Sequence, residues 1–407
     1  MFAQAKRLAL CAPLLFGMSV AASGAAFAQQ INLGAIVPSS GHFAEWGRTN
    51  TVTLKMVEKM VNDAGGINGA KLNLTILDDA AKPAQSTNAL RKLAGDDKVL
   101  AVAGPLTSSA CEVVFPVANQ LGIVSTSQAS SKPGVAKANR PWAFRNTIDE
   151  LILAKATVPY FKDTYKIKTV AVIYDAKDAT ANVVGTKIMP TLMAENDVKV
   201  LNADSLISFN TGDLDVSAQV TKLKSYDADG IVVSADYSQA VTVIREMKRQ
   251  GLNKPIVGAT QLISSAILKA APEIPIVAPT TFYVGMDTPA AKKFVADVLP
   301  LLRAQSNLPA EIEPSMYDAN IYETVNMYID AVKKSGITGK PEDLEADRVK
   351  IRDYMTNLKK FEGLAGPISF NADGDAVKLF YIVEGKNGQW ADKVHKCSDP
   401  NPAACGL

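Results

Sequence analysis

Hydrophobic and polar positions change their period from one segment to the next, which predicts alternating strands and helices. The apolar runs INLGAIVP and VLAVAG are continuous, as is typical of strands buried on both faces of a sheet. KLNLTIL alternates with a period of two, the pattern of a half-buried strand. Residues 46–62 and 83–93 instead carry apolar side chains at helical spacing. Strands separated by helices of this length predict parallel sheets with right-handed crossovers.

The same alternation starts again after Arg145. The apolar runs KTVAVIYD, VKVLNADSL, GIVVSA and KPIVGA, each expected to be a strand, are separated by helical patterns over 150–165, 179–195, 216–223 and 239–250. Further helices are expected over 289–304, 317–334 and 341–358, followed by the strands AGPISF and AVKLFYIV around the turn NADGD. The expected fold class is therefore α/β, with two successive units that are each long enough for a core of their own.

The glycine-rich segment GGINGA, residues 65–70, raises the question of a nucleotide-binding loop. Such a loop follows a strand and opens a helix, so that helix N–H groups face the phosphates. Here the glycines follow a helix and precede a strand. Gly65–Gly66 fit a helix end that requires positive φ, and Asn68–Gly69 fit a tight turn. Asp78–Asp79, at the end of the next strand, either cap the following helix or line a cleft, and nothing marks them as a catalytic pair.

The first residues have the pattern of a secretory signal peptide. Lys6 and Arg7 precede an apolar run over 8–20, and Ala26–Ala28 fits an A-x-A cleavage site. We expect residues 1–28 to be removed and the mature protein to be soluble and periplasmic; a membrane-anchored protein is the alternative. Cys11 lies at the start of the apolar run, which does not fit a lipoprotein cysteine.

Charge and cysteine content exclude several classes of function. Removal of 1–28 takes away two of the 43 basic residues and none of the 41 acidic ones, so no basic surplus remains to hold nucleic acid. Cys397 and Cys405 are placed to close a short loop in an oxidising compartment, and Cys111 has no obvious partner. The two histidines, His42 and His395, are far apart, and no pattern of metal ligands occurs. We expect no metal and no cofactor.

Beyond these patterns, the sequence resembles the periplasmic solute-binding proteins of ABC transporters of the branched-chain amino acid (Leu/Ile/Val-binding) type. The resemblance rests on segments in matching chain order: LGAIVPSSGHFAEWG, VNDAGGINGAKL, LDDAAKPAQS, VLAVAGPLTSS, GIVSTSQAS, FRNTID, KTVAVIYD, IREMKRQGL and AGPISFNADGD. It implies two doubly wound parallel-sheet lobes, joined by a three-stranded hinge, that close over a ligand. The implied N-terminal lobe comprises 29–147 and 283–364, and the implied C-terminal lobe comprises 148–282 and 365–407. It further implies a monomeric receptor without enzymatic activity that delivers its solute to a membrane permease.

Two hydroxyl-rich loops follow predicted strands of the first unit. Thr107–Ser109 come after VLAVAG, and Ser125–Ser130 begin in the next strand. Ligands of parallel sheets bind beyond the carboxyl ends of strands, and helix N-termini attract anions. The loops therefore predict a site for a carboxylate, unless these serines are ordinary helix caps.

The resemblance adds individual positions to this site. Those for the carboxylate fall on Leu106, Thr107, Ser108, Ser127 and Ala129, and an aromatic contact falls on Trp46. Relatives usually have Thr or Ser at the position of Ala129, commonly Tyr at that of Ala179, and an acid that pairs with the ligand's ammonium near that of Thr260. These departures favour a larger carboxylate without an α-ammonium, such as a benzoate or a phenylpropanoid. A branched-chain amino acid is the alternative ligand.

Asp236 leaves this preference open. It aligns with a pocket aromatic of the relatives, and we expect it to hold an ammonium, to accept a hydrogen bond from a phenol, or simply to cap the helix that follows. Additional candidates for apolar contacts are Tyr237, Tyr283, Met286 and Tyr317.

Other functions fit the sequence less well. A hydrolase needs a nucleophile beside a base, and neither a G-x-S-x-G motif nor clustered histidines occur. A cytosolic repressor of this fold would need an N-terminal pair of DNA-binding helices. The N-terminal residues of this sequence have the pattern of a signal peptide instead. A ligand-sensing partner of a chemoreceptor or sensor kinase uses the same lobes and stays an alternative.

Overall fold

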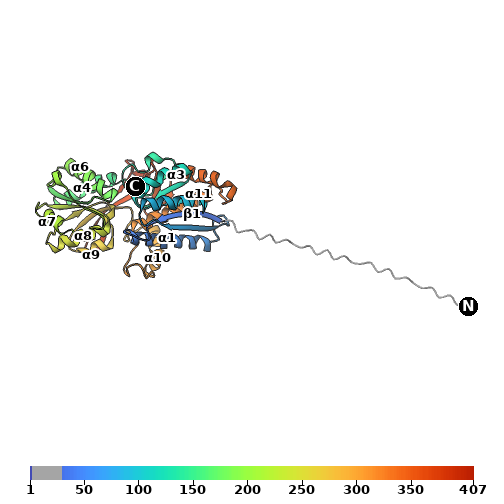
Figure 1. Cartoon of the computed structure of the whole chain (residues 1–407), viewed down its shortest axis with the longest axis horizontal. Helices are drawn as coiled ribbons and strands as arrows, with labels where there is room; N and C mark the ends of the chain where they lie inside the picture. Colours follow the sequence, from blue (N-terminus) through green and yellow to red (C-terminus); the bar gives the residue numbers. More distant parts are fainter. Residues whose placement is uncertain (2–29) are drawn as a thin grey trace.

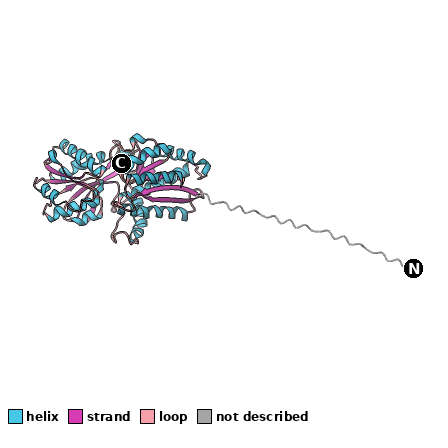
Figure 2. Cartoon of the chain, viewed as in Figure 1, coloured by secondary structure: helices cyan, strands magenta, loops and turns pink. Residues whose placement is uncertain are grey.

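The computed structural model describes Met1 and residues 30–407. The predicted signal peptide and its cleavage site lie outside the described residues. Two lobes lie side by side, and each has a sheet between helices (Figures 1 and 2). Within the described part of the chain, the helices are too short or too polar to cross a membrane.

The first sheet has five parallel strands in the order β2-β1-β3-β4-β5. Its strands are β1 (Gln30–Val37), β2 (Lys71–Asp78), β3 (Ala101–Ala103), β4 (Val124–Ser127) and β5 (Ala143–Arg145). Helices α1 (Ala44–Asp63), α11 (Met316–Lys334) and α12 (Leu344–Thr356) bury one face. Helices α2 (Pro83–Gly95) and α3 (Ser108–Leu121) bury the other. Apolar side chains on both faces explain why β1 reads as a continuous apolar run.

The second sheet has eight strands, six of them parallel. These six are β6 (Thr169–Asp175), β7 (Lys199–Val200), β8 (Ile207–Phe209), β9 (Gly230–Ser234), β10 (Ile256–Val257) and β11 (Ile276–Thr280). Strands β15 (Leu379–Lys386) and β16 (Gln389–Cys397) extend it in antiparallel pairing. Helices α4 (Glu150–Tyr165), α5 (Ala179–Val183) and α6 (Met189–Glu195) lie on one face. Helices α7 (Ser217–Lys224), α8 (Tyr237–Arg249) and α9 (Ser265–Ala270) lie on the other.

The chain passes between the two sheets three times, as the three-stranded hinge of the predicted fold requires. It leaves β5 for α4, leaves β11 for α10 (Pro289–Arg303), and enters β15 from a small sheet of β12 (Phe361–Glu362), β13 (Pro367–Phe370) and β14 (Ala376–Val377). Each passage places a polar side chain against Asn320 of α11: Asn146 Nδ2 donates to its carbonyl at 2.9 Å, Thr281 Oγ1 bonds its side chain at 3.2 Å, and Lys378 Nζ does so at 3.0 Å. The predicted residue boundaries of the lobes stay predictions.

The segment VKVLNADSL does not form the single predicted strand. It makes β7, a short 3-10 turn over Ala203–Ser205, and β8. The side chain of Asn202 explains the interruption, because it accepts from Val172 N at 2.9 Å and donates to Val172 O at 2.8 Å. An amide side chain thus takes the place of a backbone partner at this position of β6.

The turn that follows α1 has the predicted geometry. Gly65 and Gly66 have φ of 95° and 82°, and Asn68 and Gly69 have φ of 51° and 86°. A Cβ on Gly66 would lie 2.2 Å from the carbonyl oxygen of Ala70, so only glycine fits there. The segment is therefore a rigid corner, as the sequence predicts.

The cysteines behave as their spacing indicates. Cys397 and Cys405 form a disulfide at the C-terminal end. Cys111 is buried beside Phe115 and Ala136, and burial raises the pKa of its thiol to about 12. Such a thiol stays protonated and unreactive at neutral pH.

Candidate functional site

The two hydroxyl-rich loops meet at the carboxyl ends of β3 and β4. Thr107 caps α3 by accepting from Ala110 N at 3.3 Å, and Ser108 is the first residue of that helix. Ser127 Oγ accepts from Ser130 N at 3.0 Å, and Ser108 Oγ lies 2.8 Å from Ser130 Oγ. The structure therefore brings the hydroxyls of Ser108 and Ser127 into one buried cradle, beside helix N–H groups that favour an anion.

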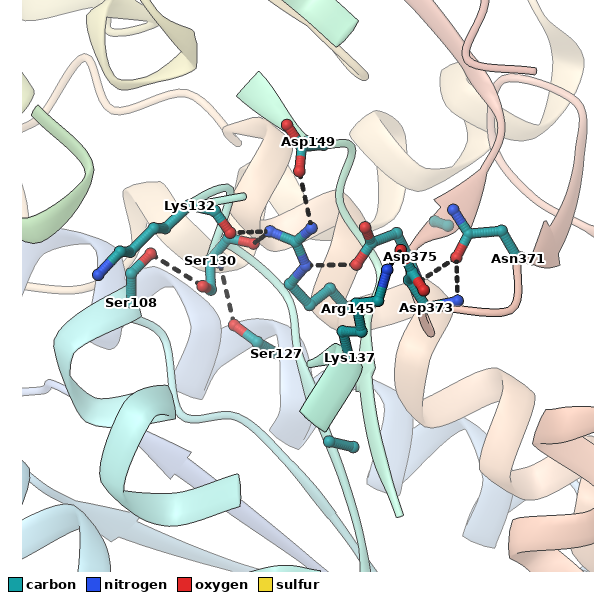
Figure 3. A network of polar contacts seen from close by, with 12 residues as sticks. Ser108, Ser127, Ser130, Lys132, Lys137, Arg145, Asp149, Asn371, Asp373 and Asp375 are labelled. Carbon is teal, nitrogen blue, oxygen red and sulfur yellow. Dashed lines mark hydrogen bonds and ion pairs between the residues drawn. The ribbon is translucent and has the colours of Figure 1, made fainter. Parts of the chain in front are cut away.

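Arg145 holds the second loop of this cradle in place (Figure 3). Its guanidinium is fully buried and donates to the carbonyls of Ser130 at 3.2 Å and Lys132 at 2.6 Å. Asp375 accepts from Arg145 Nε at 2.6 Å, and Asp149 lies 3.5 Å from its other end. Arg145 was not predicted to belong to the site, although a lone arginine at the end of the apolar strand AFR is an unusual pattern that signals a buried ion pair.

Residues of the second lobe close over the cradle. Thr180 Oγ1 of α5 lies 2.8 Å from Ser108 Oγ. Its neighbour Ala179, the predicted position, opens α5 and is partly buried. The two lobes therefore touch directly at the predicted carboxylate site, through a threonine that sequence reasoning did not select.

Asp236 performs one of the three roles left open and also makes a contact that was not predicted. Its Oδ1 caps α8 by accepting from Ser238 N at 2.8 Å, so the capping interpretation is confirmed. Its Oδ2 lies 2.8 Å from Nε2 of His42, which belongs to the loop before α1. The hydrogen bond that Asp236 accepts raises the pKa of His42 above its ordinary value, against the opposing effect of burial. This pair forms a second contact across the cleft.

Thr260, near whose position relatives have an acid, has an acidic neighbour in space. Glu150, the first residue of α4, accepts from the hydroxyl of Thr260 and from its backbone N at 3.3 Å. Glu150 is buried, and burial raises the pKa of its carboxyl to about 7. Asp178 lies close by, accepts from Gln261 Nε2 at 3.2 Å, and has its pKa raised to about 6 by burial. The second lobe thus supplies acid groups from positions that the alignment of single residues did not reveal.

Aromatic side chains form the wall of the cleft. The Trp46 ring lies 4.7 Å from that of Tyr237 and 4.4 Å from that of Tyr317, between centroids. Leu106 and Ala129 belong to the same apolar cluster. The structure therefore brings Trp46, Tyr237 and Tyr317 together. Tyr283 and Met286 also belong to this cluster, and the hydroxyl of Tyr283 donates to Asp392 Oδ1 of β16 at 2.6 Å.

Comparison with known proteins identifies the family. The model of the periplasmic binding protein family matches residues 30–389, most of the chain. The chain belongs to this family. A Leu/Ile/Val-binding protein, BraC3 of Rhizobium johnstonii, is 25% identical over 85% of this chain and 88% of its own length. A leucine-, isoleucine-, valine-, threonine- and alanine-binding protein of Pseudomonas aeruginosa is 24% identical over 91% of this chain and 94% of its own length.

Solved structures of other periplasmic binding proteins share the fold. The branched-chain amino acid transporter substrate-binding protein LivJ of Streptococcus pneumoniae, in complex with isoleucine, has a TM-score of 0.77 and 25% identity, over 91% of this chain and 99% of LivJ. A solute-binding protein of an ABC transporter from R. palustris, in complex with benzoate, has a TM-score of 0.78 and 18% identity, over 93% of this chain and 100% of that one. The fold thus accommodates both an aliphatic amino acid and an aromatic acid.

One constellation of this periplasmic binding protein has the composition of a hydrolase triad. Ser238 Oγ lies 3.2 Å from Nε2 of His42, and Asp236 Oδ2 lies 2.8 Å from the same nitrogen. In a triad, the acid bonds one nitrogen of the histidine ring and the nucleophile bonds the other nitrogen. The acid orients the ring, and the ring takes the proton of the nucleophile. The arrangement is therefore a bridge between lobes. Elsewhere among residues 30–407, no group of His, Cys, Asp and Glu is placed to hold a metal ion.

Proposed function

We propose that this periplasmic binding protein is the exported, substrate-binding component of an ABC uptake transporter. It captures a small apolar carboxylate between its lobes and presents the closed form to a membrane permease. The observation that carries this proposal is the buried cradle of Ser108 and Ser127 at the carboxyl ends of β3 and β4, closed from the other lobe by Thr180 at 2.8 Å.

The cradle has the chemistry that a carboxylate requires. Its hydroxyls and the N–H groups of Ala129 and Ser130 are donors, and they bond one another at present, with Ala129 N to Ser127 Oγ at 3.4 Å. A carboxylate would replace these weak internal bonds by charge-assisted ones. Arg145 lies behind the loop and holds its carbonyls in place, which fixes the position of the cradle donors.

Two ligand classes fit the opposite end of the cleft, and a different observation favours each. The rings of Trp46, Tyr237 and Tyr317, and the small side chain at Ala179, favour an aromatic acid of the benzoate or phenylpropanoid type. The buried carboxyl of Glu150 favours a branched-chain amino acid, because an ammonium ion would pair with it. A phenol hydroxyl donating to Asp178 or Glu150 would serve the aromatic acid equally.

The decisive experiment is a thermal-shift screen of leucine, isoleucine, valine, benzoate, hydroxybenzoates and phenylpropanoids. A ligand that binds only the folded state at about 100 times its Kd adds roughly 2.7 kcal/mol to the free energy of unfolding. We expect one carboxylate class to stabilise the protein, Ser108→Ala to weaken its binding, and Ser109→Ala to leave binding unchanged. Absence of stabilisation by any carboxylate, or full binding by the Ser108→Ala variant, contradicts the proposal.

Calorimetry separates the two classes further. An ammonium ion beside Glu150 keeps that carboxyl ionised, so an amino acid will release a proton on binding near neutral pH. Benzoate, which has no hydroxyl to donate to Glu150, will not release a proton, and Glu150→Gln will weaken binding of the amino acid but not of benzoate. Titrations in two buffers of different ionisation enthalpy measure this proton release.

A further inference from the structure

A cavity of about 340 Å³ lies beside the ligand cleft and shares Trp46 with it. Residues of α1 and of the segment that leads into α11 line it from the first lobe, and residues of α9 and β16 line it from the second. Of the positions predicted to contact the ligand, only Trp46 and the additional candidate Tyr283 contribute to its wall. It is therefore a separate space between the lobes, which the proposed transport of a carboxylate does not use.

The lining of the cavity carries negative charge without a counter-ion. Glu45, Glu313 and Asp318 line it, and its wall contains no Lys, Arg or His from the described residues. Asp318 is fully buried and is held by neutral donors only, Asn50 at 2.8 Å and Ser315 at 2.8 Å. The side chain of Glu45 has no hydrogen bond or ion pair with any described residue, and burial together with Asp318 raises its pKa.

Aromatic side chains form much of the remaining wall. Trp46, Phe282, Tyr283 and Trp390 line the cavity from both lobes. The indole N–H of Trp390 is buried and has no partner among the described residues. Indole and phenol faces attract a positive charge, and the attraction is largest for Trp and for sites withdrawn from water.

We propose that this cavity binds a small organic cation, such as a quaternary ammonium compound. Carboxylates beside aromatic faces provide the environment that an alkylammonium ion requires. A metal ion fits less well, since it needs converging oxygen ligands; in the described part of the chain, no three acidic or histidine side chains converge in that way. Because the lining comes from both lobes, a bound cation favours the arrangement in which the lobes touch.

The test uses the full mature protein, choline as the probe, and isothermal titration with Trp fluorescence as a second readout. We expect saturable binding of choline and no binding of its neutral isostere, in which carbon replaces the nitrogen. Glu45→Gln will weaken choline binding roughly tenfold, the effect of one lost charge contact, and Trp390→Leu will weaken it as well. Glu362→Gln, an exposed acid paired with Lys360 within the first lobe, is the matched control and will leave binding unchanged.

Three results would overturn this assignment: no saturable binding of choline, equal binding of the neutral isostere, or unchanged affinity in the Glu45→Gln variant. Titration of choline into protein saturated with the stabilising carboxylate distinguishes the two sites, since the carboxylate will not displace choline. Melting temperatures of Glu45→Gln and Trp390→Leu establish that the loss of binding is not a loss of folding. A protein that binds no carboxylate but binds choline would refute the proposed transport function and leave the cation site in place.

Discussion

His42 and Asp236 join the lobes by a single contact whose strength depends on pH. The side chain of Asp236 is fully buried, whereas that of His42 is 26% exposed. The hydrogen bond that Asp236 accepts raises the pKa of His42, and the charges of Asp236, Asp175 and Asp178 act in the same direction. A raised pKa means that the stabilisation is fully present below the ordinary pKa, about 6.5, and is lost as the pH rises through the raised value.

We therefore expect His42→Gln to lower the free energy of unfolding at about pH 6, by roughly 1 kcal/mol for a partly exposed pair. At about pH 8.5 the two proteins will be equally stable. Urea unfolding of both across this range measures the difference. Glu150 and Asp178 also have raised pKa values, so both proteins lose stability as the pH rises, and only the difference between them reports on His42. A difference that is independent of pH would show that the bridge is uncharged.

At the scale of single residues, the sequence reveals a site residue only where its neighbours along the chain mark it out. Ser108 and Ser127 are visible because a hydroxyl follows an apolar strand, and the edge of a parallel sheet collects such positions. Glu150 is not visible, because it looks like an ordinary acid in the first turn of a helix. Its burial depends on Thr260, which lies 110 positions further along the chain. Arg145 depends in the same way on Asp375, 230 positions away.

Among the elements, those with a strong period are predicted well. The helix expected over 150–165 forms as α4 with the same limits, and the apolar run GIVVSA forms β9. Strand β11 was not predicted, because Pro279 lies within it and proline normally argues against a strand inside a sheet. Pro279 lies in register with Ile382 of β15, the first antiparallel strand of this sheet. Strand β11 pairs with β15 only after the chain has passed through the first lobe and returned. The sequence pattern around β11 gives no sign of that pairing.

The hinge depends on one buried ion pair. Lys378 Nζ lies 2.6 Å from Oε2 of Glu323, and both side chains are 3% exposed. Asn146 Nδ2 donates to the same oxygen at 3.1 Å, so two of the three passages between the lobes converge on one residue of α11. The cost of burying these charges is offset only while both partners remain.

Lys378→Met is therefore expected to lower the free energy of unfolding by about 3–5 kcal/mol, because it leaves the Glu323 carboxylate buried without a cation. Adding Glu323→Gln removes the charge and keeps an acceptor for Asn146, so the double variant will recover much of this loss. Urea denaturation of the three proteins tests the pair. A single variant as stable as the parent would mean that water reaches Glu323.

At the scale of the molecule, the two-lobed plan follows from the repeated α/β alternation and from the resemblance, whereas the contact between lobes does not. That contact includes Ser108 with Thr180, His42 with Asp236, Trp46 with Tyr237 and Lys269 with Glu311. Each pair joins residues from separate units of the sequence. Each pair alone contributes little to the free energy of unfolding compared with the hydrophobic cores. The relative position of the lobes is thus set by a few weak contacts, and a ligand that touches both can shift it.

Closure on the ligand is the prediction that belongs to this scale. Without ligand, the cradle hydroxyls and Thr180 satisfy one another only weakly, so the free protein is expected to populate a more open form than the structure shows. Saturation with the stabilising carboxylate will then reduce the radius of gyration measured by small-angle scattering. Ser109→Ala will show the same reduction, and Ser108→Ala will need more ligand to reach it. A radius that stays unchanged at saturation would mean that capture of the ligand does not involve closure, because a ligand with equal affinity for both forms shifts neither.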